Sequence, residues 1–223
     1  MHQPNYLPWL GYFDKMRSAD VFVLLDTVQY PRGRSVANRN TIRTGDDTAL
    51  LTVPVSVPKG RDGKVGYDEI TFADDRWREK HIRTVAQAYA KAPHHAELAE
   101  QFERQLTEAT DLLDLNLRLI AWHRERFGIE TRTPRLSELG DDLGHKTDMI
   151  VELCRRFDCD VYLSGTGAAA YNDEAQLQAA GIQLRYQRFE HPEYSQTGPG
   201  FIPNLAALDA LLNCGGWPDS RTS

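Results

Sequence analysis

The chain has 223 residues, enough for one substantial core and too few for two comfortable domains. Its formal net charge of -6 disfavours nucleic acid and anionic membranes as partners, because both usually require a basic surface. There is no signal segment, no apolar run near the ~20 residues that span a bilayer, and no paired cysteine framework. We therefore expect a cytoplasmic protein that does not enter a membrane.

The opening stretch, MHQPNYLPWLGYFDK, combines prolines with aromatic and polar side chains. Pro4 and Pro8 prevent a regular helix through the first eight residues, and Pro8 suits a helix start. Trp9, Phe13 and Met16 then recur at helical spacing, which predicts a short helix.

Three apolar segments follow that are typical of strands. Residues 19–26 (ADVFVLLD) form an unbroken apolar run that ends in Asp26, as expected for a strand buried on both faces. Residues 49–58 and 68–72 are predicted as further strands, separated by a polar, glycine-rich loop.

The middle of the chain, about residues 76–127, is predicted to be largely helical, with one helix ending at Pro93 and the next running from 95 to Gly128. A helix is expected at 145–157, and strand, glycine turn and helix at 160–173.

A last strand lies within 181–196, and a last helix at 204–215 is capped by Gly215. Strand–helix alternation at both ends predicts an α/β fold with a mainly parallel sheet flanked by helices. We expect a single domain over residues 1–223, with a frayed tail from about 217.

Three predicted strand ends carry reactive side chains: Asp26, the turn at Ser164–Gly167, and His191. Ligands of parallel sheets bind at the carboxyl ends of the strands, so we expect these groups to share one cleft. His191 is a candidate general base, oriented by Asp26, with a surface turn histidine as the alternative. Ser164 is a weaker candidate nucleophile, because no G-x-S-x-G elbow surrounds it.

Three stretches could bind an anion. His2, Gln3 and Tyr6 stand at the head of a predicted helix, although an aromatic plug over the sheet would use the same residues. The turn with Gly165 and Gly167 could contact phosphate, or could be only a tight turn. Arg39, Asn40 and Arg43 could offer forked hydrogen-bond donors to a phosphate or carboxylate. The alternative is that these residues form only a solvated loop. No metal-ligand spacing is present, and no metal is expected.

Taken together, these stretches resemble the WbqC-like family. The matching pieces include HQPNYLPWLGYFDK, NRNTIR, HKTDMI, YLSGTGAAAY and HPEYSQ, in this order. The resemblance implies a bacterial enzyme-like protein with a site lined by His2, Gln3, Tyr6, Trp9, Asp26, Gln29, Arg39, Asn40, Ser164, Tyr171, His191, Tyr194 and Gln196. Such relatives usually place an apolar strand before the His-Gln-Pro stretch, so either translation starts upstream of Met1 or this member lacks that strand.

The resemblance favours a transferase that moves an acyl or aminoacyl group onto an amino or hydroxyl acceptor. The acceptor would be an amino sugar, a sugar nucleotide or a secondary-metabolite intermediate, in surface-polysaccharide or natural-product biosynthesis. The expected partners are a small-molecule substrate, phosphopantetheine-carried or nucleotide-activated, and an acyl carrier protein. Two alternatives remain open: nucleotidyl transfer with ATP and magnesium, and a non-catalytic binding module of a biosynthetic complex.

Overall fold

The computed structural model describes residues 1–31, 33, 35–59, 64–140 and 143–218, and only the backbone of residues 169–171. Helix α1 (Leu10–Arg17) begins after Pro8, as predicted. Its side chains Phe13 and Met16 are fully buried, while Trp9 is the N-cap and only partly buried. The predicted apolar stripe therefore packs into the core.

Four short strands form two antiparallel hairpins in the first third of the chain. Strand β1 (Arg39–Thr44) pairs with β2 (Asp47–Thr52) across a turn in which Gly45 has φ +65°, a conformation that favours glycine. The NRNTIR stretch is thus a strand, not a loop. Strand β3 (Val55–Ser56) follows Pro54 and pairs with β4 (Thr71–Phe72), just after the 3₁₀ helix η2 (Tyr67–Glu69).

The middle segment is helical, as predicted, but it contains three helices: α2 (Arg76–Ala88), α3 (His95–Thr107) and α4 (Leu112–Arg126). The helix expected from 95 to 128 is broken because the carboxylate of Asp111 accepts from the backbone N–H of Asp114 and starts a new helix. Helix α7 (Ala207–Cys214) packs against α3, α4 and β1. Gly215 caps it with φ +76°, as predicted.

A second group of elements follows the 3₁₀ helix η3 (Leu136–Glu138): α5 (Thr147–Arg156), β5 (Val161–Ser164), η4 (Thr166–Tyr171), α6 (Glu174–Ala179) and β6 (Gln183–Tyr186). Strands β5 and β6 are parallel. The predicted order of strand, glycine turn and helix is present, although the turn opens into a 3₁₀ helix.

The prediction of a mainly parallel sheet is wrong for the described part of the chain. Within the described part of the chain, the strands form three separate two-stranded sheets, and one of them is parallel. In the segment predicted as a strand, residues 19–26, Ala19 and Asp20 form a bend after α1. The rest makes only isolated parallel bridges, of Val21 to Arg132 and of Leu24 to His2 and Arg135. Pro134 accepts from the N–H of Leu24 but has no N–H of its own to donate, so one hydrogen bond of a regular ladder is missing there, and the pairing resumes only where Leu136 N–H donates to Leu24.

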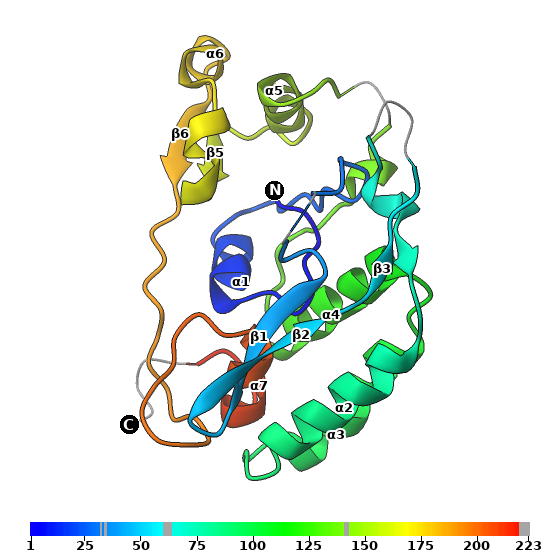
Figure 1. Ribbon diagram of the computed structural model, residues 1–223. Coiled ribbons are helices and arrows are strands. Elements are labelled where there is room, and N and C mark those ends of the chain that lie inside the picture. The colour runs from blue at the N-terminus through cyan, green and yellow to red at the C-terminus, as the bar shows by residue number, and fades with distance from the viewer. Residues whose placement is uncertain (32, 34, 60–63, 141–142, 219–223) are drawn as a thin grey trace.

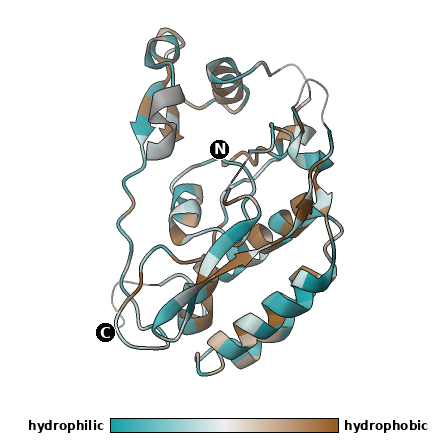
Figure 2. Cartoon of the chain, in the orientation of Figure 1, coloured by the Kyte–Doolittle hydropathy of each residue, from teal (hydrophilic) through white to brown (hydrophobic). Residues whose placement is uncertain are grey.

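Figure 1 shows the two groups of elements at opposite ends of the molecule, with α1 between them. The larger hydrophobic core joins α1 to α2, α3, α4 and α7, and a smaller one lies among α5, α6, β5 and β6. Figure 2 shows that the visible face of α2 is largely hydrophilic, as expected for a helix that covers the larger core. Among the described helices, none is both long and apolar enough to cross a membrane.

Candidate functional site

Two adjoining cavities lie between the opening segment and the β5–β6 group. The large cavity encloses about 1250 Å³ and the small cavity about 360 Å³. Both are lined by Met1, Lys15 and Tyr162. The large cavity has room for a cofactor-sized ligand and contains several residues that the sequence singles out, so we treat it as the candidate site.

One wall of the large cavity comes from the opening stretch and α1. The ring of His2 lies 5.9 Å from that of Trp9, edge to face, and both residues line the cavity with Gln3 and Lys15. His2 Nδ1 is 3.0 Å from the backbone oxygen of Gln3, a pure acceptor, so Nδ1 carries the proton and Nε2 is an acceptor. Burial, together with nearby Lys15, lowers the pKa of His2 to about 4, so its ring is neutral at pH 7.

The opposite wall comes from the start of α5 and from the glycine turn. Lys146 is the N-cap of α5, and Gly165, Gly167 and Asn172 also line the cavity. A Cβ at Gly165 or Gly167 would meet no atom within 4 Å, and neither backbone needs a positive φ. Neither packing nor conformation therefore requires these glycines, and their small size leaves the cavity floor open to a ligand.

A third wall is the segment that follows β6. Gln187 Nε2 donates to the backbone oxygen of Gly11 at 2.8 Å and to the carboxylate of Asp14 at 2.9 Å, which ties this segment to α1. Arg188 and Phe189 line the cavity beside it.

The charges on the walls have one sign. Lys15, Lys146 and Arg188 line the large cavity, and none of its lining residues in the described structure is Asp or Glu. Aromatic side chains, Trp9 and Phe189, supply flat apolar surface beside these cations. Such a site favours a ligand with both an anionic and an apolar part.

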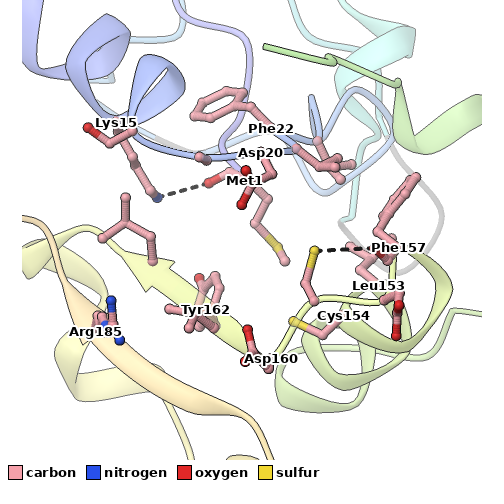
Figure 3. Close-up of a pocket in the computed structure, with 18 residues that line it drawn as sticks. Met1, Lys15, Asp20, Phe22, Leu153, Cys154, Phe157, Asp160, Tyr162 and Arg185 are labelled. Atoms are coloured by element: carbon pink, nitrogen blue, oxygen red, sulfur yellow. Dashed lines mark hydrogen bonds between the residues drawn. The ribbon is translucent and has the colours of Figure 1, made fainter.

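Figure 3 shows the small cavity, where the side chain of Lys15 extends from α1 and donates to the backbone oxygen of Met1 at 3.0 Å. Asp20 and Asp160 lie on its rim with Arg185, so its charges are mixed. Burial raises the pKa of Cys154 to about 11, which keeps this thiol protonated and a poor nucleophile at neutral pH.

Five of the predicted site residues line the large cavity: His2, Gln3, Trp9, Gly165 and Gly167. Ser164, which directly precedes Gly165, is fully buried at the end of β5. Its Oγ accepts from Asn172 Nδ2 at 3.0 Å and donates to the backbone oxygen of Gly165. No histidine of the described structure hydrogen-bonds to Ser164, so nothing there activates it as a nucleophile.

Asp26 does not pair with His191, contrary to the prediction from the sequence. Asp26 accepts from the backbone N–H of Ser137 at 2.9 Å and from its hydroxyl at 2.6 Å. His191 Nδ1 donates to the oxygen of Pro192 at 2.9 Å, and its ring packs against Phe201. The two side chains thus have different partners, and neither lines the large cavity.

Arg43, Tyr194 and Gln196 belong to a buried network that holds the loop of residues 196–202 against α7. Arg43 donates to Gln196 Oε1 and to the oxygen of Gly200, both at 2.8 Å. The carboxylate of Asp209 on α7 accepts from Tyr194 and from Gln196, also at 2.8 Å. Burial raises the pKa of Asp209, partly offset by these hydrogen bonds and by Arg43. This network lies outside the large cavity.

The remaining predicted residues whose side chains the structure describes do not line the large cavity either. Tyr6 is fully buried and hydrogen-bonds to His81 at 2.8 Å, as the alternative of an aromatic plug predicts. Asn40 Nδ2 donates to the oxygen of Leu7, which has φ +45°. The last two are Gln29, whose backbone oxygen accepts from Gln3 Nε2 at 3.4 Å, and Arg39, which begins β1. The side chain of Tyr171 is outside the described part of the structure.

Sequence reasoning missed the cations of the large cavity. Lys15 and Lys146 lie within the matched stretches HQPNYLPWLGYFDK and HKTDMI, and Arg188 closely follows β6. Lys146 lies at a predicted helix start and Arg188 near a predicted strand end, and these positions were the available signal for a binding site. Their convergence depends on contacts between distant segments, which no local pattern reports.

The fold and the cavity define a mixed α/β protein with a cation-lined cleft between two groups of elements. The profile of the WbqC-like protein family matches residues 3–219, and the chain belongs to this family. It is similar to the uncharacterized protein Rv1507c of Mycobacterium tuberculosis (strain ATCC 25618 / H37Rv), with 34% identity over 218 residues that cover 96% of this chain and 92% of that protein. No solved structure matches the chain significantly.

Proposed function

We propose that this WbqC-like protein is a transferase that moves an acyl or aminoacyl group onto an amino or hydroxyl acceptor. The acceptor is an amino sugar, a sugar nucleotide or a natural-product intermediate, and the large cavity binds a phosphate-bearing substrate. The observation that carries the proposal is the cavity itself, in which Lys15, Lys146 and Arg188 line one space with no carboxylate among its described lining residues.

The chemistry of the walls supports a substrate with a phosphate and an extended organic part. The guanidinium of Arg188 offers a fork of donors for two phosphate oxygens, and Lys146 adds a point charge. Trp9 and Phe189 present apolar faces to a nucleoside base, a sugar ring or a pantetheine arm. Gly165 and Gly167 allow the ligand to approach the backbone closely.

A binding screen tests the proposal. We expect coenzyme A, as a phosphopantetheine probe, or UDP-N-acetylglucosamine to raise the melting temperature, because a ligand that binds only the native state stabilises it. The double variant Lys146→Ala/Arg188→Ala should lose this shift. The matched control Lys80→Ala/Lys91→Ala removes the same charge from exposed sites that do not line the cavity, and should keep the shift.

The screen also separates the alternatives. A shift that requires ATP with magnesium would replace acyl transfer by nucleotidyl transfer. Binding of coenzyme A or a sugar nucleotide, with no product by mass spectrometry when acetyl-coenzyme A and amino sugars are supplied together, would indicate a binding module. No shift with any of these phosphate-bearing compounds would refute the proposal.

A further inference from the structure

Lys15 is a lysine whose side chain is almost wholly enclosed by the fold: the residue is only 5% exposed. Lysines are rarely buried without a charged partner. The Nζ atom of Lys15 donates to the backbone oxygen of Met1, whereas Asp14, its neighbour on α1, pairs with Arg17 at 3.6 Å. Among the described residues, no carboxylate forms an ion pair with Lys15. Packing alone does not explain an amine at this position.

The amine lies at the junction of the two cavities, so the groups on both sides must be considered. On the side of the small cavity these are Asp20, Asp158, Asp160 and Arg185. On the side of the large cavity they are His2, Lys146 and Arg188. Met1 lines both cavities, and burial, together with Lys15, lowers the pKa of its amine to about 4, so this amine is neutral at pH 7. Burial raises the pKa values of the remaining titratable groups, Cys154, Cys159 and Tyr162, so these stay neutral.

Burial lowers the pKa of Lys15 to about 8. In about one tenth of the molecules the amine of Lys15 is then neutral at pH 7, compared with well under a thousandth for a lysine of ordinary pKa. A neutral amine can accept a proton or attack a carbonyl carbon, and enzymes obtain such amines by burying lysine.

We infer that Lys15 is the proton-transfer group of the large cavity, placed to take the proton of the acceptor while Lys146 and Arg188 hold the phosphate of the donor. This inference rests on the proposed function. With an amine acceptor and an acyl thioester, the acceptor nitrogen forms a bond to the carbonyl carbon and its proton passes to Lys15 Nζ. The carbon–sulfur bond then breaks, and the thiolate takes the proton back from Lys15. Amide and free thiol are the products.

The test is a chemical probe that requires no known substrate. Pyridoxal 5′-phosphate carries an aldehyde and a phosphate; it condenses with a neutral amine to an imine with loss of water, and borohydride then reduces the imine to a stable adduct. Peptide mapping separates the six lysines of the chain and the Met1 amine. The exposed residues Lys80 and Lys91 serve as internal references.

We expect Lys15 to be labelled at least ~10-fold faster than Lys80 or Lys91 at pH 7.5, with a rate that rises with a midpoint near pH 8. Pyrophosphate should slow the labelling of Lys15, and pyridoxal without phosphate should react more slowly. Lys15→Arg should remove the adduct and leave the labelling of Lys80 unchanged. An unlabelled Lys15 beside labelled references, or preferred labelling of Lys146, would overturn the inference.

The two proposals fail in different ways. If pyridoxal labels Lys15 rapidly but pyrophosphate gives no protection and coenzyme A no thermal shift, the reactive amine stands and the phosphate-binding function falls. If coenzyme A or a sugar nucleotide binds but Lys15 is no more reactive than Lys80, the function stands and Lys15 is only a buried cation.

Discussion

His123 is a histidine on α4 with no exposed surface, and its ring stacks on Phe13 with a centroid distance of 5.4 Å. Burial lowers its pKa to about 4, from an ordinary value of 6.5. The unfolded chain therefore binds the proton first, and stability falls as the pH drops from about 6.5 towards 4. The loss from this residue reaches roughly 3 kcal/mol at pH 4.

We predict that His123→Phe reduces the decline in the free energy of unfolding between pH 6.5 and 4, because phenylalanine retains the stacking and cannot be protonated. Urea unfolding at several pH values measures this slope. The exposed His145→Phe is the control and should leave it unchanged. His2 and His81, whose pKa values burial also lowers to about 4, should maintain a residual slope. An unaltered slope in His123→Phe would contradict the prediction.

The burial of Lys15 also affects the stability of the fold. Its folded pKa of about 8 lies below the ordinary 10.5, so the charged amine destabilises the fold by roughly 3 kcal/mol below pH 8, and the penalty disappears above about pH 10.5. Lys15→Met has a similar length and no charge. We therefore expect it to raise the free energy of unfolding at pH 7, by up to about 3 kcal/mol. A less stable variant would assign Lys15 a structural role.

At the scale of elements, Asp111 explains why the helix expected from 95 to 128 is two helices. Its Oδ1 accepts from the N–H of Asp114 at 2.8 Å and satisfies one of the free donors of the first turn of α4. We predict that Asp111→Ala lowers the free energy of unfolding by about 1 kcal/mol. The exposed Glu103 of α3 makes no side-chain hydrogen bond or ion pair within the described structure, so Glu103→Ala should change this free energy by less than ~0.5 kcal/mol in the same chemical denaturation.

The loop of residues 196–202 depends on one buried cation. Arg43 donates to Gln196, Gly45, Pro199 and Gly200, and it stabilises the charged form of nearby Asp209. Arg43→Met would remove a buried donor from each of these acceptors and the positive charge near Asp209, which would keep only its neutral donors Tyr89, Tyr194 and Gln196. We predict a loss of about 3–5 kcal/mol, measured by urea unfolding.

The same variant separates structure from binding. At temperatures where Arg43→Met remains folded, coenzyme A should bind it as it binds the unaltered protein, because Arg43 does not line the large cavity. A weakened affinity with unchanged stability would instead place Arg43 in substrate binding, as the sequence suggested.

At the scale of the whole molecule, the large cavity joins two groups of elements that have separate hydrophobic cores. A ligand between α1 and the start of α5 would contact both groups. We predict that coenzyme A slows backbone hydrogen exchange in α1 and in β5 together. Helix α3 contributes no lining residue and lies at the opposite end of the molecule from α5 in Figure 1, so it should be unaffected. Protection of β5 alone would mean that the ligand binds elsewhere.

The charge of the cavity predicts how this protection responds to salt. Attraction between a phosphate and partly exposed cations weakens as ionic strength rises, because the Debye length shortens from about 10 Å at 0.1 M to 3 Å at 1 M. Affinity for coenzyme A should therefore fall steeply over this range, as titration calorimetry would measure. An affinity independent of salt would exclude these cations as the main source of binding.

The amino-acid sequence by itself determined the features that depend on neighbouring residues. The helical middle segment, the start of α1 after Pro8 and the glycine cap of α7 all follow from spacing and backbone preference within a few residues. The matched stretches also indicated the family, and five of the predicted residues do line the large cavity.

Only the tertiary structure decided which polar groups meet. Asp26 pairs with Ser137, 111 residues away, and Arg43 with Gln196, 153 residues away, so neither is free for the partner the sequence suggested. Lys15 looks like an ordinary surface cation of a short helix until the segments around Met1 and Tyr162 cover it. The physical reason is that desolvation and charge pairing depend on the segments that fold over a side chain, and local periodicity contains no information about them.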